Sequence, residues 1–305
     1  MKRLILLLVL FIIFGALVFI RWEEIETIVN TYLIKYRKNI EIGEVNDYYR
    51  NMDFDYVKIT DNFFPENKKD LTNVVYTILN AGKDEFTFYC PKEYETCVSD
   101  VQELANDQSK LSDINNFVHP FNGFSNIAFE YDNLGRVTVK ITKIYSDERI
   151  QEINQRIDDL LPTITSTSNS KEENIKSIHD YIINHTKYDS LRSEQGIETY
   201  ESNNAYGPLF QGYAICGGYT DLMELFLERL DVKSYKVSSD SHVWNAIYLN
   251  NRWSHLDLTW DDPVADDGKD YLLDSFFLIS TNDLLEKEET QHEFDLSIYS
   301  ELKEA

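Results

Sequence analysis

The sequence is poor in basic residues. Its 305 residues include 29 Lys and Arg against 53 Asp and Glu, which gives a formal net charge of −24. A chain of this charge repels the phosphate backbone of nucleic acids and anionic lipid headgroups, so we expect no nucleic-acid partner. With 43% hydrophobic and 13% aromatic residues, the chain has enough apolar side chains for a core. Its length favours one large domain or two ordinary ones.

Cysteine is also scarce, with three residues in the whole chain. Cys90 and Cys97 flank the polar segment PKEYET, and two cysteines so close in an exported chain predict a disulfide-closed loop. Zinc is the weaker interpretation, because the sequence lacks a second cysteine pair or spaced histidines beside them. The acidic run DDPVADDGKD lacks EF-hand spacing, which favours a solvated loop over a calcium site. We therefore expect no metal and no cofactor.

The N-terminus carries a long apolar run, MKRLILLLVLFIIFGALVFIRW. Residues Leu4 to Ile20 have no charged side chain, and a helix of this length spans roughly 26 Å, enough for a thin bilayer. Lys2 and Arg3 precede the run, which predicts a cytoplasmic N-terminus and export of the remainder. Because an A-x-A-like cleavage site is missing, a signal anchor over residues 1–22 is favoured over a cleaved signal peptide. Either alternative places the remaining residues on the extracytoplasmic side, and the anchor predicts a single-pass cell-membrane protein.

Three segments follow the apolar run. Residues 23–44 show helical spacing and predict a juxtamembrane helix. Residues 45–146 mix period-two stretches, such as EFTFYC and SNIAFEYDNLGRVTVKITKIY, with helical stretches, such as LTNVVYTILN and VSDVQELANDQSKLSDIN. This mixture predicts a small α+β domain, which either positions the next domain or binds a partner. The candidate chemistry falls in the last segment, residues 147–295.

Two helical patterns open this last segment. DERIQEINQRIDDLL and SNSKEENIKSIHDYIINH each carry an apolar stripe. Ser170, followed three residues later by Glu173, predicts a capping box at the start of the second helix. His179 lies inside that helix, and we interpret it as structural, because a histidine near an apolar face more often satisfies a local hydrogen bond.

The third cysteine has a different setting. In GYAICGGYTDLMELFLERL, Cys216 precedes an apolar pattern with helical spacing, and Gly217 and Gly218 mark the start of the helix. Free amides and the positive dipole at a helix N-terminus stabilise a thiolate, which predicts a lowered thiol pKa. A buried structural cysteine would more naturally occur within the apolar stripe. The position favours a nucleophile, which needs a base and a group that orients the base.

A predicted hairpin supplies both of these groups. The runs HVWNAIYL and RWSHLDLTW are rich in β-branched and aromatic residues, and the two asparagines between them suit a two-residue turn with positive φ. In that register His242 faces Thr259 and Trp244 faces Asp257, all on one face of the sheet. The side chains of His242 and Asp257 are then diagonal neighbours, within reach of a carboxylate–imidazole contact. His255 shares this face, and we interpret it as structural.

Together these stretches resemble the bacterial transglutaminase-like cysteine proteins, which share a catalytic layout with papain-like enzymes. The resemblance rests on YGPLFQGYAICGGYTDLMELFLERL, on HVWNAIYLNNRWSHLDLTWDDP and on IHDYIINHTKYD upstream, and it covers about residues 147–280. It implies an α+β fold in which the cysteine helix packs against an antiparallel sheet. It also implies Cys216 as nucleophile, His242 as base and Asp257 as the residue that holds the imidazole.

The residues and the resemblance predict a thiol enzyme that acts on peptide or protein amides through a thioester on Cys216. Water would complete a hydrolysis and an amine a transamidation, and both remain open. The backbone N–H of Cys216 is the first candidate oxyanion donor, and Gln211 is a candidate second donor. Trp244 is a candidate wall of the substrate groove. The alternative function is a non-catalytic surface module that uses the same fold to bind a protein partner.

The apolar N-terminal run gives a first test. We expect the chain to remain in the membrane with residues 23–305 outside, because the run follows two basic residues and lacks a small-residue cleavage site. The measurement is cell fractionation followed by sequencing of the N-terminus. Mature protein in the medium that begins near residue 20 would contradict the anchor and favour the cleaved signal peptide.

Overall fold

The computed structural model describes residues 40–132, 135–264, 271–287 and 290–304, together with Gly15, Phe19 and Arg21. The predicted signal anchor and juxtamembrane helix therefore lie almost entirely outside the described residues. Within the described part of the chain, no helix is long and apolar enough to cross a membrane. Ile42–Ala305 form one compact unit, and the proposed boundary at residues 146 and 147 stays a prediction.

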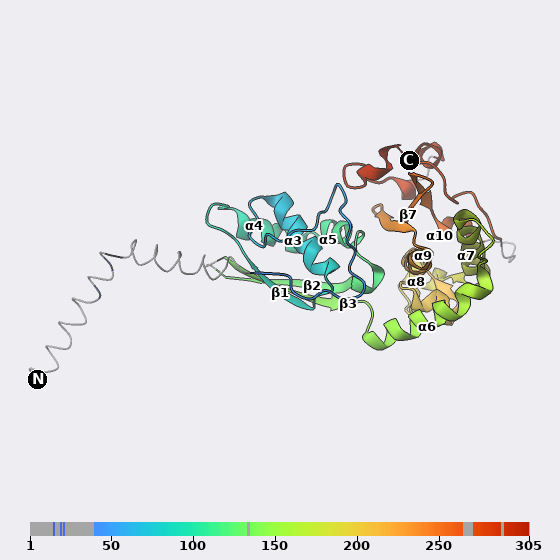
Figure 1. Ribbon diagram of the computed structural model, residues 1–305, viewed down its shortest axis with the longest axis horizontal. Helices are drawn as coiled ribbons and strands as arrows, with labels where there is room; N and C mark the ends of the chain where they lie inside the picture. Colours follow the sequence, from blue (N-terminus) through green and yellow to red (C-terminus); the bar gives the residue numbers. More distant parts are fainter. Residues whose placement is uncertain are drawn as a thin grey trace, which may run out of the picture. The chain divides into compact units, whose positions relative to one another are not determined.

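An antiparallel sheet and three helices build the first part of this unit (Figure 1). The sheet has the order β1-β3-β2, formed by β1 (Glu85–Tyr89), β3 (Arg136–Lys143) and β2 (Phe124–Tyr131). The helices are α3 (Lys68–Asn80), α4 (Cys97–Asn106) and α5 (Gln108–Asn115). The single helix expected over residues 98–115 is thus two helices. They are separate because Asp107 ends α4 and caps α5, where its carboxylate accepts the backbone N–H of Lys110 at 3.0 Å.

The first two cysteines are joined by a disulfide. Cys90 directly follows β1 and Cys97 is the first residue of α4, with their Cα atoms 5.5 Å apart. The bond closes the PKEYET loop between the sheet and the helix. Cys216 remains a free, partly buried thiol.

The second part contains the cysteine helix and a second antiparallel sheet. Its main helices are α6 (Asp147–Ile164), α7 (Lys171–His185) and α9 (Cys216–Arg229). The sheet has the order β6-β7-β8, formed by β6 (Lys233–Ser238), β7 (Val243–Leu249) and β8 (Arg252–Leu256). Helix α9 packs against β6 and β7, and it shares one apolar core with α6 and α7. This is the mixed α+β arrangement that the sequence predicts.

Local sequence signals explain how two of these elements begin and turn. The capping box at the start of α7 is present, with Ser170 and Glu173 each bonded to the other's backbone N–H. In the β7–β8 hairpin, Asn250 and Asn251 have φ angles of 52° and 63°, and Leu249 pairs with Arg252. Both features are confirmed as predicted.

The second strand of this hairpin is shorter than predicted. β8 ends at Leu256, and α10 (Leu258–Asp261) begins where the strand was expected to continue. The cause is Asp257, whose side chain accepts the backbone N–H groups of Thr259 and Trp260 and so caps α10. The predicted pairing of His242 with Thr259 is therefore wrong, because Thr259 lies in a helix and His242 precedes β7.

Two carboxylates on α9 connect this helix to its surroundings. Asp221 accepts hydrogen bonds from Lys236 Nζ and Tyr145 Oη, each at 2.6 Å. Glu224, whose side chain is 1% exposed, pairs with Arg50 at 2.5 Å. Arg50 also lies within 3.4 Å of two backbone carbonyl oxygens, one of them in β6. The N-terminal segment of the unit is therefore fastened to α9 by a buried ion pair.

This ion pair predicts a large loss of stability when it is broken. Arg50→Met should lower the free energy of unfolding by about 3 kcal/mol or more, because it leaves the buried Glu224 carboxylate without its cation. The second oxygen of Glu224, Oε2, is already buried without a hydrogen-bond partner among the described residues. The measurement is urea unfolding at neutral pH.

The matched control is Lys140→Met, which breaks an ion pair with Glu130 on the surface. Exposed pairs contribute little to stability, so this variant should unfold at nearly the same urea concentration as the parent chain. Equal, small effects of the two substitutions would show that the Arg50–Glu224 pair does not hold the N-terminal segment in place.

Candidate active site

Cys216 is the first residue of α9. The preceding residue, Ile215, has extended backbone angles and no side-chain cap, so the first amides of the helix are not occupied by a capping side chain. The strand β5 (Tyr213–Ala214), which leads to the cysteine, pairs in parallel with β4 (Lys187–Tyr188). The thiol is therefore held at a fixed point, at the positive end of the helix dipole.

The two glycines after the cysteine are needed for close packing. A Cβ on Gly218 would lie 2.3 Å from the carbonyl oxygen of Ser202, and a Cβ on Gly217 would lie 2.5 Å from Oδ1 of Asn203. The backbone N–H of Ile215 also donates to Ser202 at 2.8 Å. Because Gly217 and Gly218 have no side chain, the loop around residue 202 can contact the backbone at the start of α9.

His242 lies directly before β7, beside the start of α9. The hydroxyl of Thr220 on α9 is 2.8 Å from the carbonyl oxygen of Cys216 and 3.1 Å from that of Val243, which ties the two elements together. The His242 ring stacks on Trp244 with 5.6 Å between centroids. These contacts bring the imidazole next to the thiol, close enough for Cys216 to affect the pKa of His242.

Asp257 is a buried carboxylate that accepts four hydrogen bonds. Its Oδ1 accepts the backbone N–H groups of Thr259 and Trp260 at 2.9 and 3.3 Å. Its Oδ2 lies 2.6 Å from Nε2 of His242 and 2.8 Å from Nε2 of His292. An ionised carboxylate only accepts, so both imidazoles donate their Nε2–H. Nδ1 of His242 is then the nitrogen left for the thiol, and the structure thus brings the three predicted triad residues together.

The electrostatics of this group favour charged forms. Burial alone would lower the pKa of His242, but the charge and hydrogen bond of Asp257, with a smaller effect of Cys216, raise it to about 10. Burial opposes ionisation of Asp257 as well, yet the two histidines hold the pKa of Asp257 well below its usual range. An imidazolium beside a carboxylate is the state that stabilises a neighbouring thiolate.

His292 was missed by the sequence analysis. It lies in η3 (Thr290–His292), in a polar C-terminal stretch with no local motif, and it is 2% exposed. The one sequence signal for His292 is that histidine is rare in this chain, which has six in 305 residues.

The ligand atoms of His242, Asp257 and His292 lie within 4.8 Å of one another, a spacing that would also suit a metal ion. A metal would need the lone pairs of both Nε2 atoms, which here carry the protons donated to Asp257. The 2.6 and 2.8 Å separations are hydrogen-bond distances, shorter than two ligands of one tetrahedral zinc would allow. We therefore assign a hydrogen-bonded cluster.

Trp244 and His255 form a separate buried pair. The indole N–H of Trp244 donates to Nδ1 of His255 at 2.9 Å, and Nε2 of His255 lies 2.9 Å from the hydroxyl of Thr281 in α11 (Thr281–Glu286). Burial, together with the charge of His292, lowers the pKa of His255 to about 3, so this ring is neutral. The indole N–H is thus already used and is not available to an oxyanion. His255 has the structural role expected of it.

The remaining candidates lie at the edge of the cluster. Gln211 ends η2 (Gly207–Gln211), and its side-chain oxygen accepts the backbone N–H of Glu201 at 2.8 Å. That contact orients the amide, while its role as an oxyanion donor stays a prediction. His179 is buried between Asp180 and Asp261, at 2.8 and 3.1 Å, which agrees with a structural role.

The acidic run after the hairpin lies partly outside the described residues, which omit 265–270. Its first two members are already used within the fold. Asp261 accepts the backbone N–H of Phe276 at 3.0 Å, and Asp262 accepts the hydroxyl of Tyr219. Neither carboxylate faces a solvated loop, contrary to what the sequence predicts for this stretch.

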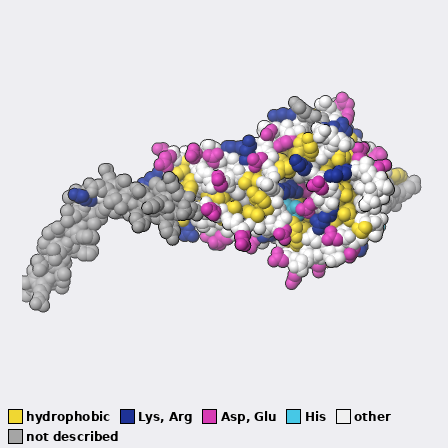
Figure 2. Space-filling view, viewed as in Figure 1, with side chains coloured by type: hydrophobic (Ala, Val, Ile, Leu, Met, Phe, Trp, Pro, Cys, Tyr) yellow, Lys and Arg dark blue, Asp and Glu magenta, His cyan; other side chains and the backbone are white. Residues whose placement is uncertain are grey.

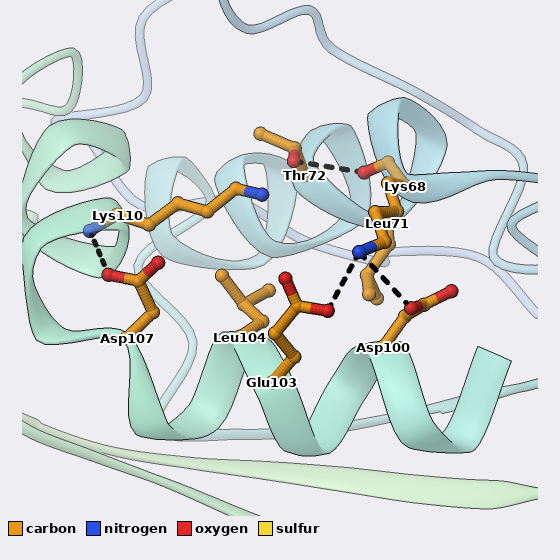
Figure 3. Close-up of a pocket in the computed structure, with 8 residues that line it drawn as sticks. All are labelled: Lys68, Leu71, Thr72, Asp100, Glu103, Leu104, Asp107 and Lys110. Atoms are coloured by element: carbon orange, nitrogen blue, oxygen red, sulfur yellow. Dashed lines mark hydrogen bonds and ion pairs between the residues drawn. The ribbon is translucent and has the colours of Figure 1, made fainter. Parts of the chain in front are cut away.

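A small hollow lies between α3, α4 and α5, and residues of these three helices and the loop between α4 and α5 line it (Figure 3). Its charged side chains pair with one another, since Lys68 Nζ is 2.7 Å from Glu103 and 3.4 Å from Asp100. Figure 2 shows Asp and Glu side chains spread over the visible face rather than gathered into one patch. Among the described residues, the cluster around Cys216 therefore contains the groups that a nucleophilic site needs, a thiol, an imidazole and a carboxylate.

Cys216 starts a helix that packs on an antiparallel sheet, and His242 and Asp257 lie at the ends of two strands of this sheet. This arrangement is that of a Cys-His-Asp thiol site. Residues 158–258 match the family described as the Transglutaminase-like superfamily, so this stretch of the chain is transglutaminase-like. The resemblance predicted from the motifs is therefore confirmed.

Individual relatives are distant. The human Kyphoscoliosis peptidase is 24% identical over 129 residues, which cover 36% of this chain and 19% of that protein. The chain thus spans about a fifth of the length of this curated relative. Among solved structures, a TGase shares 15% identity over 45% of each chain, with a TM-score of 0.34. A putative cysteine protease from Cytophaga hutchinsonii shares 15% identity over 44% of this chain and 61% of its own, with a TM-score of 0.27.

The coupled charges of His242 and Asp257 predict how stability depends on pH. The pKa of His242 is raised from 6.5 to about 10 on folding, so its stabilising effect is complete below pH 6.5 and is lost as the pH rises toward 10. The pKa of Asp257 is depressed, so its effect is present above 3.8 and is lost as the pH falls through its folded value. The stability difference between the parent chain and His242→Ala should be largest near pH 5 to 6 and decline by at most about 1.4 kcal/mol per pH unit above it.

The measurement is urea unfolding of both proteins between pH 5 and pH 10. His185→Ala is the control, because His185 is an exposed histidine at the end of α7. A difference that stays constant over the whole range would mean that His242 does not gain a proton on folding.

Proposed function

We propose that this protein is a thiol enzyme that acts on peptide or protein amides through a covalent thioester on Cys216. The observation that carries the proposal is the hydrogen bond of Asp257 to His242, with Cys216 beside that imidazole as the first residue of α9. A surface that only binds a partner has no need for a thiol, an imidazole and a buried carboxylate in this order. The match to the transglutaminase-like superfamily and the peptidase name of the human relative support amide chemistry.

The reaction follows from the positions of these groups. The Cys216 thiolate attacks the amide carbonyl carbon, and the sulfur–carbon bond forms as the carbonyl oxygen takes the negative charge. The backbone N–H of Cys216 is the nearest donor for this oxyanion. His242 gives its proton to the leaving amine, the carbon–nitrogen bond breaks, and a thioester remains. Asp257 keeps the imidazole in the tautomer whose Nδ1 faces the sulfur.

The second half of the reaction determines the product. Water that attacks the thioester releases a carboxylate and makes the enzyme a peptidase or amidase, whereas a primary amine makes it a transamidase. In both cases His242 removes a proton from the attacking group and the thiolate leaves. Cys216 is partly rather than fully buried, as a nucleophile that must meet a substrate requires.

The proposal places the enzyme outside the cytoplasm, attached to the cell membrane by residues 1–22. It rests on the apolar run after Lys2 and Arg3 and is supported by the Cys90–Cys97 disulfide, since disulfides persist in oxidising compartments.

Substitution of the triad tests the proposed chemistry. Cys216→Ser should nearly abolish turnover because a hydroxyl is far less ionised than a thiol, and His242→Ala should lower it by roughly 10²- to 10⁴-fold. Asp257→Asn should keep the fold but still lower turnover, since an amide favours the wrong imidazole tautomer. The measurement is mass spectrometry of peptides incubated with the protein and a primary amine, which separates cleavage, deamidation and amine incorporation.

His179→Ala and His255→Ala are the controls, and both should mainly lower stability. If His255→Ala removes activity while His242→Ala retains it in folded protein, the assignment of the base is wrong. A Cys216 thiol that is alkylated no faster than a free thiol at neutral pH, with no effect of His242→Ala, would instead favour the non-catalytic binding module.

A further inference from the structure

The C-terminal segment brings a second histidine to the triad carboxylate. His292 lies 35 positions after Asp257 in the chain, and its Nε2 is 2.8 Å from Oδ2 of Asp257. The same oxygen is bonded to Nε2 of His242, so two imidazoles share one carboxylate oxygen. The segment around His292 is anchored independently, because Ser239 Oγ donates to the carbonyl oxygen of Gln291 at 2.6 Å.

The His292 ring is held by apolar neighbours. It stacks on Phe276 with 4.9 Å between centroids and packs against Trp260 at 5.2 Å and Trp244 at 5.0 Å. Its Nδ1 is buried without a hydrogen-bond partner among the described residues. A buried polar nitrogen without a partner costs free energy, and among the described residues the ring's hydrogen bond to Asp257 is the contact that offsets this cost.

We propose that His292 is a positioning residue of the thiol site, which holds Oδ2 of Asp257 in place so that the carboxylate keeps His242 aligned with Cys216. This inference rests on the proposed function, because it assigns His292 a purpose in preparing the nucleophile. The group that prepares Cys216 would then consist of His242, Asp257 and His292, drawn from two separate parts of the sequence.

The geometry explains why a second imidazole is useful. The backbone amides of Thr259 and Trp260 fix only Oδ1 of Asp257. Without His292, His242 would be the sole holder of Oδ2, and any rotation of the carboxylate would move the catalytic imidazole with it. A rigid N–H donor on the other side of Oδ2 prevents this rotation and stabilises the anion.

Among the residues that the structure describes, few other charged groups face this cluster. Cys216 approaches from α9, His242 from the start of β7, and the neutral His255 from β8. Lys287, after α11, lies 4.7 Å from the centre of the Phe276 ring, on which His292 stacks. Changes at His292 are therefore felt through Asp257 and reach the thiol through His242.

The test compares His292→Phe and His292→Gln in the full-length chain. Phe keeps an aromatic ring for the stack but has no donor, whereas Nε2 of Gln can occupy the place of the imidazole Nε2 and donate. The readout is the rate at which iodoacetamide alkylates Cys216 between pH 4 and pH 9. Because Cys90 and Cys97 are paired and the chain has three cysteines, this signal comes from Cys216 alone.

His292→Phe should lower the alkylation rate at pH 6 about tenfold, the lower end of what one hydrogen bond to a charged group contributes. The acid side of the profile should also move to higher pH, because an imidazolium that is no longer aligned with the sulfur stabilises the thiolate less. His292→Gln should restore both the rate and the profile to within about twofold of the parent chain. His185→Gln, at an exposed histidine, is the matched control and should change neither.

Two results would overturn the inference. One is a His292→Phe profile equal to that of the parent chain, and the other is a His292→Gln variant as impaired as His292→Phe, which would indicate ring packing rather than donation. If His292→Phe does not fold, the tautomer decides: ¹⁵N histidine spectra at pH 7 should show a protonated Nε2 on His292, and a bare Nε2 would overturn the inference. Alkylation needs no substrate, so failure of the proposed turnover and failure of this inference are distinguishable.

Discussion

A buried carboxylate that must be satisfied by donors organises the active site. Asp257 is 2% exposed, and an anion removed from water is tolerated only when hydrogen bonds and opposite charge replace its hydration. Its two oxygens receive four N–H groups, two from the first turn of α10 and two from imidazoles. The end of β8, the position of His242 and the path of the C-terminal segment all follow from this requirement.

The same constraint operates on the other side of the cysteine helix. Asp221 and Glu224 lie buried on α9, and each draws a cation from another part of the chain, Lys236 from β6 and Arg50 from the N-terminal segment. The first part of the unit, whose sequence carries no chemical motif, is thereby fastened to the helix that bears Cys216.

Two histidines that lie close together in the sequence have different charge states because their surroundings differ. His242 faces an anion and a thiol, so its charged form is favoured despite burial. His255 accepts the indole N–H of Trp244 and meets no compensating anion at hydrogen-bond distance among the described residues, so burial keeps it neutral. A neutral, fully bonded ring supports the sheet, whereas the charged ring beside the thiol is suited to proton transfer.

The sequence by itself determined the local features. The spacing of apolar residues and the glycines placed Cys216 at a helix start, the Asn250–Asn251 pair set the hairpin register, and Ser170 with Glu173 marked the start of α7. These signals depend on neighbours within a few residues, so they can be recognised in a linear pattern. Only the tertiary structure decided how Arg50 reaches α9 and that His292 bonds Asp257. Those contacts join residues far apart in the chain, and they form because buried charges must find partners wherever the fold brings them.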